Sequence, residues 1–315
     1  MKCLFALASL IVATTAAHAS FDMMLLPDTN GGVTRYDPVN RVRLGSFATG
    51  NPTPWHSVNL SSTSGEAYLT GNANYRFDYN TGTMIGSSAF PVGLTTSNLD
   101  GSRFVETFST TFYTYNSSMS AINAFAPAGP TMLSGLSLAT DRLAMMVIDS
   151  TPNVILRVRN DATSALVSTT LASTAIINNA SAMTLMSTNV NFSTLRYGFF
   201  NGGNLTVQLL TVNLNTLSTS VTSSQTLTGY ATTATVSIMR AHDGYWVVGR
   251  DSTTPSLTRI TGVSAVGTVY SSYTTSDVSV PTSRWVGANV VAPEPGTMAA
   301  LGIGVAALLR RRRKA

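Results

Sequence analysis

Six oxygen-bearing side chains, each at the end of the predicted inner strand of a successive repeat unit, are the residues best suited to hold a cation. They are Asp28, Asn72, Glu106, Asp149, Asn201 and Asp251. Hard cations such as Ca²⁺ prefer carboxylate and amide oxygens, so we expect a calcium or ligand site if these strand ends meet around one channel, with Asp28, Asp149 and Asp251 as its metal ligands. Asp and Asn at strand ends also make Asx turns that satisfy local backbone groups. The sequence favours this second interpretation, and the prediction is therefore no cofactor, with Ca²⁺ as the alternative.

The sequence offers few residues suited to nucleophilic catalysis or to metal binding by histidine. His56 and His242 are the histidines beyond the N-terminal leader, and neither stands in a metal-ligand spacing. The sequence contains no Gly-x-Ser-x-Gly motif. Trp55 and Tyr230 stand in loop-like surroundings, where an exposed ring could stack on a sugar. We therefore predict no catalytic residue in this chain.

The N-terminus has the three parts of a secretory signal peptide. Lys2 gives a positive start, Leu4 to Ala13 an apolar run, and Ala17-His18-Ala19 a small-residue cleavage site before Ser20. We predict that residues 1–19 are removed on export. The chain's one cysteine, Cys3, is removed with them, so the mature protein must fold without a disulfide.

The C-terminus also has three parts. Val-Ala-Pro-Glu-Pro-Gly at 291–296 precedes an apolar run of 13 residues, Thr297–Leu309, and five cations close the chain. Prolines 293 and 295 hold the backbone extended and separate a folded body from the tail. The apolar run is shorter than the roughly 20 residues of a bilayer-spanning helix. A short apolar helix stopped by the basic cluster is the prediction for this segment.

This tail resembles the PEP-CTERM sorting signal of exopolysaccharide-making Gram-negative bacteria. By that resemblance Pro293, Glu294, Pro295 and Gly296 form the sorting motif. The basic stop is Arg310, Arg311, Arg312, Arg313 and Lys314. The resemblance implies a processing enzyme of the exosortase type that cuts near the motif, and contact with the inner membrane during sorting. It also implies an exported protein of the envelope or cell surface, transiently or stably anchored by its C-terminus.

The charge of the chain belongs to its two targeting segments. Net charge is +5, but between residues 20 and 292 there are 13 arginines, no lysine and 13 acidic residues. Nucleic-acid partners favour a basic body. A neutral body rich in Ser, Thr, Asn and Gly favours strands and turns and gives no support for nucleic-acid binding.

The body repeats a turn and an alternating apolar strand. The turns are Ser64-Gly65, Asp100-Gly101, Asp141-Arg142 and Asp243-Gly244. A second recurring position, at the end of a strand, is held by Asp37, Asp78, Asn116, Asn160, Asn213 and Thr261. These positions step by 41, 38, 44, 53 and 48 residues. A period of 40–50 residues with four strands per unit is typical of a β-propeller blade.

Six units fit residues 20–290, which we predict to be an all-β propeller followed by the sorting segment 291–315. They span 21–50, 55–91, 92–128, 131–172, 176–228 and 231–273. The first unit is one strand short, and the strand-like Asp277–Val280 and Trp285–Val291 follow the last. We expect a last strand to close the ring by pairing with the first blade, which removes an exposed edge. Seven blades are the alternative, because 176–228 is long.

The body resembles the broad propeller family whose blades carry an Asp-x-x-Thr-Gly hairpin, through Asp78-Tyr79-Asn80-Thr81-Gly82. That resemblance implies architecture alone. The function we expect is non-enzymatic: an exported, envelope-sorted protein with a binding or structural role in an exopolysaccharide matrix. The alternative is an extracellular metal-dependent propeller hydrolase or lactonase.

Overall fold

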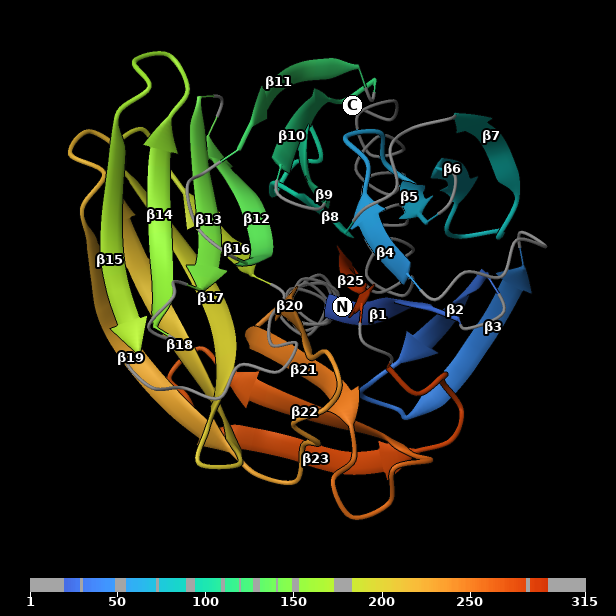
Figure 1. Ribbon diagram of the computed structural model, residues 1–315. Helices are drawn as coiled ribbons and strands as arrows, with labels where there is room; N and C mark the ends of the chain where they lie inside the picture. The colour runs from blue at the N-terminus through green and yellow to red at the C-terminus, as the bar shows by residue number, and fades with distance from the viewer. Residues whose placement is uncertain are drawn as a thin grey trace, which may run out of the picture.

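The computed structural model describes residues 20–28, 31–48, 55–71, 74–88, 94–108, 111–118, 120–126, 131–139, 141–148, 153–172, 183–281 and 284–293. Within these ranges 25 strands form six sheets, which Figure 1 shows arranged as blades around a central axis. The protein is therefore a six-bladed β-propeller. The predicted signal peptide and C-terminal apolar helix lie outside the described residues. No helix in the described part is long and apolar enough to cross a bilayer.

In blades 3 to 6 the strands form an antiparallel meander whose first strand lies innermost, whereas blades 1 and 2 each receive an additional inner strand from the C-terminal part of the chain. Blade 1 holds β1 (Ser20–Pro27), β2 (Gly32–Asp37), β3 (Val42–Ala48) and, from the other end of the chain, β25 (Ala288–Pro293). Blade 2 holds β4 (Trp55–Leu60), β5 (Glu66–Thr70), β6 (Asn74–Asp78), β7 (Met84–Ser88) and β24 (Arg284–Val286). Blade 3 holds β8 (Leu94–Ser97), β9 (Arg103–Phe108), β10 (Thr111–Asn116) and β11 (Ala121–Phe125).

The other three blades follow the same order. Blade 4 holds β12 (Thr131–Ala139), β13 (Arg142–Ile148), β14 (Val154–Asn160) and β15 (Leu166–Ala172). Blade 5 holds β16 (Thr184–Thr188), β17 (Phe192–Asn201), β18 (Asn204–Asn213) and β19 (Thr219–Leu227). Blade 6 holds β20 (Ser237–Ala241), β21 (Gly244–Arg250), β22 (Thr258–Ser264) and β23 (Val269–Thr275). Each predicted unit coincides with one blade, so the prediction of six rather than seven is confirmed.

Burial changes from the inside of a blade to its rim. The second strands, such as β21, are buried on both faces because each blade is covered by its two neighbours. β14 alternates, with Val154, Leu156 and Val158 buried and the residues between them less so. The fourth strands β3, β11, β19 and β23 are largely exposed, and β19 and β23 are rich in Ser and Thr. The core therefore lies between neighbouring sheets.

The recurring Asp and Asn positions make the turns between the third and fourth strands. The Oδ1 atom of Asp37 accepts hydrogen bonds from the backbone N–H groups of Val39 and Asn40, both at 2.9 Å. Asp78, Asn116, Asn160 and Asn213 accept equivalent bonds from backbone N–H groups two to four residues later. A short acceptor side chain that satisfies a tight turn explains why the same residue types recur in blades 1 to 5. The prediction for Thr261 is wrong, because this residue lies within β22 and not at the end of a strand.

The N-terminal and C-terminal strands pair with each other in blade 1 and close the ring of blades. β25 pairs antiparallel with β1, so the first blade obtains its missing strand from the C-terminal segment, as expected. The predicted single strand 285–291 is instead divided at Gly287, with β24 pairing in parallel with β4 of blade 2. A Cβ atom at Gly287 would lie 2.8 Å from the Leu26 side chain, so a larger residue there would require Leu26 to shift. The predicted strand Asp277–Val280 is wrong, since this segment is irregular.

Candidate functional site

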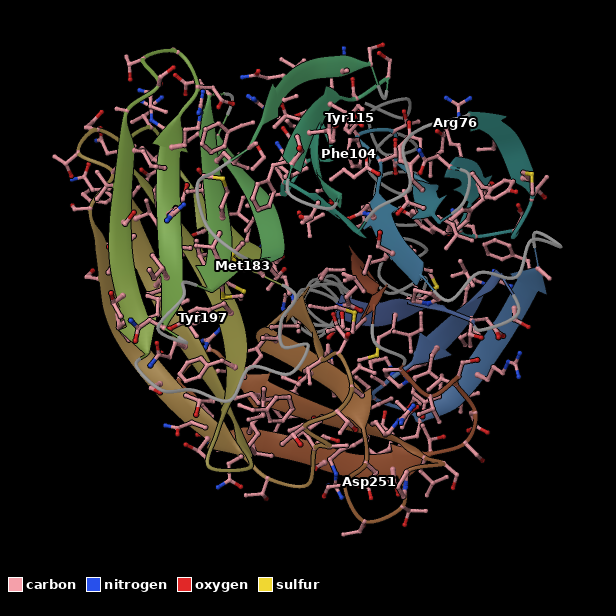
Figure 2. The ribbon with its side chains drawn as sticks, viewed as in Figure 1. Arg76, Phe104, Tyr115, Met183, Tyr197 and Asp251 are labelled. Carbon is pink, nitrogen blue, oxygen red and sulfur yellow. The ribbon has the colours of Figure 1, made fainter. Side chains whose placement is uncertain are left out.

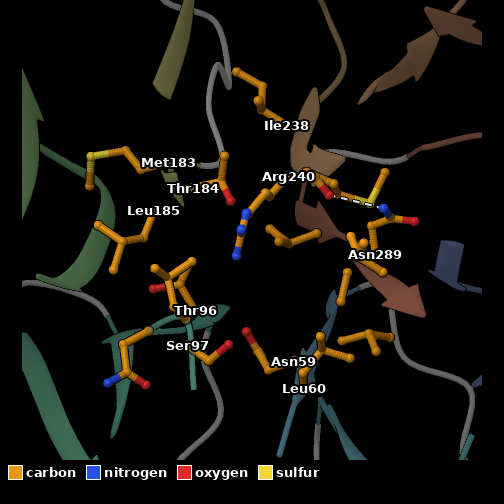
Figure 3. A pocket seen from close by; sticks show the side chains of 18 residues that line it. Asn59, Leu60, Thr96, Ser97, Met183, Thr184, Leu185, Ile238, Arg240 and Asn289 are labelled. Carbon is orange, nitrogen blue, oxygen red and sulfur yellow. Dashed lines mark hydrogen bonds between the residues drawn. The ribbon is translucent and has the colours of Figure 1, made fainter. Parts of the chain in front are cut away.

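The central channel holds a cavity of about 230 Å³. Its walls are formed by the innermost strands β4, β8, β16 and β20 and by the closing segment of β24 and β25 (Figure 3). The apolar part of the wall consists of Val58, Leu60, Leu99, Met183, Leu185, Ile238, Met239, Val286, Gly287, Ala288 and Val291. The polar part consists of Asn59, Thr96, Ser97, Asn98, Thr184, Arg240 and Asn289. A mostly apolar wall with a few polar groups is the usual build of a ligand site.

Arg240 is the one charged residue among those that line the cavity. Its neighbours on β20 are buried, whereas its own side chain is exposed. Figure 3 shows this side chain reaching into the open centre, with Thr184 and Leu185 on one side and Asn59 on another. A guanidinium offers five N–H donors and a positive charge, and low-dielectric channel walls concentrate its field.

The backbone at Arg240 is fixed, although its side chain has no partner in the described part of the chain. The carbonyl oxygen of Arg240 accepts a hydrogen bond from Asn289 Nδ2 at 2.9 Å, which ties β20 to β25. In the described residues, no hydrogen bond or ion pair occupies the guanidinium, or the hydroxyls of Ser97 and Thr184. Thr96 differs, because its hydroxyl donates to the Gly135 carbonyl of the next blade. Within the described part of the chain, the channel therefore presents the Arg240 guanidinium and two hydroxyl groups, none of which is occupied by another protein group.

The predicted ring of oxygen ligands lies elsewhere. Glu106 is within a second strand, β9, and Asn201 and Asp251 stand at the ends of the second strands β17 and β21. Asp28 follows β1, which is second in its blade because β25 lies inside it. None of these four side chains lines the cavity. The prediction that these four residues end innermost strands is wrong. They lie on or directly after second strands, because in blades 3 to 6 the strand that precedes the recurring turn is the inner one.

Asp251 illustrates what such a position does. Figure 2 places it at the outer part of blade 6, whereas Met183 lies beside the channel. The carboxylate is 1% exposed and forms an ion pair with Arg259, whose Nη2 lies 2.6 Å from Oδ2. Its Oδ1 accepts hydrogen bonds from the backbone N–H groups of Thr253 and Thr254 at 2.9 and 2.7 Å. Burial acts to raise the pKa of Asp251, but these hydrogen bonds and that of Arg259 outweigh it and lower the pKa to about 2.

The other described members of the ring also have local roles. Asp28 Oδ1 accepts a hydrogen bond from the Ser279 hydroxyl at 2.9 Å. Asn201 is exposed and faces Asn204 across a tight turn. Asn72 and Asp149 lie outside the described residues. Among the described residues no three His, Cys, Asp or Glu side chains come together as a metal site.

Glu106 is the least ordinary member of the ring. Its side chain is 3% exposed in blade 3 and accepts a hydrogen bond from the Tyr115 hydroxyl at 2.7 Å (Figure 2 labels Tyr115). Burial raises the pKa of Glu106 to about 7, against the smaller lowering effect of the Tyr115 hydrogen bond. The neutral carboxyl is thus favoured by the fold. Glu106 is a buried polar group between blades and does not reach the channel.

The remaining singled-out residues have structural surroundings or fall outside the described part. His242 Nε2 lies 3.5 Å from Asp243 Oδ1 in an exposed turn. Tyr230 is buried, and its hydroxyl donates to Thr261 Oγ1 at 2.7 Å, so it is no surface platform for a sugar. The side chains of Trp55 and His56 are outside the described part. Sequence reasoning missed Arg240, whose one signal was its place on the strand before the Asp243-Gly244 turn.

Comparisons with known proteins support the assignment of the C-terminal sorting motif and of the propeller fold. The PEP-CTERM protein-sorting motif model matches residues 291–314. A search of curated proteins found no match to the sequence. The fold is similar to that of TolB from Acinetobacter baumannii, with a TM-score of 0.56 and 14% identity over 88% of this chain and 67% of that one. It is also similar to the Cps50 (Swd1) β-propeller domain of Myceliophteria thermophila, with a TM-score of 0.52 and 10% identity over 79% of this chain and 82% of that one. At these identities the likeness concerns the fold alone.

Proposed function

We propose that this exported six-bladed propeller, sorted through its PEP-CTERM motif, is a non-enzymatic binding protein of an exopolysaccharide-rich matrix. Its central channel takes a carboxylate-bearing sugar of an acidic glycan. The observation that carries the proposal is Arg240, a cation that no described residue pairs, at the centre of a concave site.

The chemistry of the channel supports this ligand class. A guanidinium matches a carboxylate with two parallel N–H···O bonds. The free hydroxyls of Ser97 and Thr184 can exchange hydrogen bonds with sugar hydroxyls, and the side chains of Leu185 and Ile238 offer apolar surface to a sugar ring. The body as a whole is formally neutral, so Arg240, and not a net positive charge of the body, would attract an anion to the channel.

Titration of the exported protein with an oligoglucuronate and with a neutral oligoglucose tests the proposal. We expect the acidic chain to bind and the neutral chain to bind at least tenfold more weakly. Arg240→Gln should reduce affinity for the acidic chain tenfold to a hundredfold, because a hydrogen bond to a charged group contributes about 1.5–3 kcal/mol. Binding should also weaken as salt is added.

Arg43→Gln is the matched control, because it removes the same charge from an exposed position on the outer strand β3. Equal affinity of the wild-type protein and the Arg240→Gln variant for the acidic chain would refute the proposal. So would concentration-dependent self-association with no glycan binding, which would favour a purely structural role.

A further inference from the structure

The sorting motif begins inside the strand that closes the propeller. β25 ends at Pro293, and the PEP-CTERM match starts at Val291, so three residues of the motif belong to the sheet. The ladder with β1 pairs Val291 with Asp22 and Pro293 with Ser20. Ser20 is also the first residue after the predicted signal-peptide cleavage site. Both processed ends of the chain therefore lie side by side at one end of blade 1.

A buried carboxylate fastens this pair of strands to blade 6. Asp22 is 6% exposed, and its Oδ2 accepts a hydrogen bond from Trp246 Nε1 at 2.8 Å. Its Oδ1 accepts one from Asn289 Nδ2 at 2.9 Å and one from the His242 backbone N–H at 3.3 Å. One side chain thus joins β1, β25 and the turn before β21, two residues from the start of the mature chain.

The other end of β25 is equally constrained. The hydroxyl of Ser237 on β20 accepts a hydrogen bond from the Gly287 N–H at 3.0 Å. A Cβ atom at Gly287 would lie 2.8 Å from the Leu26 side chain, so the chain packs closely against β1 at this end of the strand. Loss of β25 would uncover β1, whose Met24, Leu25 and Leu26 are fully buried, and would leave Asp22 without its Asn289 partner.

We propose that the processing cut that separates body from tail falls on the C-terminal side of Pro293, and that the mature body keeps the whole of β25. The step is a hydrolysis: water adds across the peptide bond, the new carboxylate stays on the body and the new amino group leaves with the tail. Because β25 is held by the ladder and by Asp22, residues 288–292 are closed to a processing enzyme in the folded protein. This proposal is independent of any ligand in the channel.

Intact-mass measurement of the full chain tests the position of the cut. The protein is expressed in an exopolysaccharide-making Gram-negative host that has an exosortase, and in the same host without it. We expect a mature protein that begins at Ser20 and ends at or beyond Pro293 in the first strain, and residues 20–315 in the second. A C-terminal residue before Pro293, or an uncut chain in both strains, would overturn the proposal.

A variant with Val291-Ala292-Pro293 duplicated ahead of Glu294 provides a second test. One copy completes β25, and the other restores an uninterrupted motif outside the ladder. The mature variant should keep every residue of β25 and should melt at the same temperature as the wild type. A mature variant whose mass shows that it ends within the first Val-Ala-Pro copy would place the cut inside the strand and contradict the inference.

Discussion

Replacing Glu106 by Gln should remove a pH dependence of stability that has an unusual sign. The pKa of Glu106 is raised from 4.5 to about 7 by burial, so the unfolded state releases its proton at a lower pH than the folded state does. The carboxyl therefore costs no stability below pH 4.5, and the cost grows as the pH rises through the range 4.5–7 and then levels off. The two pKa values differ by about 2.5, and one pKa unit corresponds to about 1.36 kcal/mol. The loss of folding stability caused by ionising Glu106 is therefore at most about 3 kcal/mol.

The glutamine variant keeps the oxygen that accepts the Tyr115 hydrogen bond but buries an amide NH₂ group. It should be less stable than the wild type at pH 4.5 by about 1–3 kcal/mol, the cost of an unsatisfied buried group. At pH 8 the difference should vanish or reverse, because the wild-type protein then carries a buried charge. Urea denaturation followed by tryptophan fluorescence, at fixed ionic strength and at steps from pH 4.5 to 8, measures the two curves.

Glu66→Gln is the matched control, since Glu66 is the body's other glutamate and its side chain is 20% exposed near Arg76. Its curve should run parallel to that of the wild type. The reasoning about burial is refuted if the Glu106→Gln curve also runs parallel to the wild type across this pH range.

Three further substitutions probe the closure, the turns and the channel. Asp22→Ala should lower the free energy of unfolding by about 2–4 kcal/mol, because it leaves the buried Trp246 N–H unpaired; a loss below about 1 kcal/mol in urea denaturation would contradict this. Asp251→Ala should lower the free energy of unfolding by about 3–5 kcal/mol, because it leaves the Arg259 guanidinium without its carboxylate partner. The loss should be the same in the presence of calcium and in the presence of a chelator. A calcium-dependent loss in thermal melting would instead support a metal site. Arg240→Gln should change stability by less than about 0.5 kcal/mol, as expected for an exposed side chain with no partner among the described residues, and a larger change in the same melting assay would show that this arginine is structural.

The blades could be predicted from the sequence because one turn recurs. Asp78 and Asn213 occupy the same place in their blades and accept backbone hydrogen bonds in the same way, so local chemistry alone marks the period. The closing strand was also predictable, since the first unit was short and a strand followed the last. Local turn chemistry is independent of the rest of the fold, which is why a single sequence displays it.

The channel could not be predicted in the same way. Arg240 and Thr184 come together only because their strands are innermost, and innermost strands carry no shared residue type. For this reason the sequence analysis predicted the oxygen-bearing residues on innermost strands, whereas the described ones lie on or after second strands. The break at Gly287 was missed because it reflects a close approach of Leu26, 261 residues earlier in the chain, and not a local pattern.

The most direct measurement of the central claim is a crystal structure of the exported protein with a bound oligoglucuronate. The account predicts a sugar carboxylate in the central channel, with both oxygens within hydrogen-bond distance of the Arg240 guanidinium. A sugar bound on the outer strands, with the channel holding only water, would contradict it.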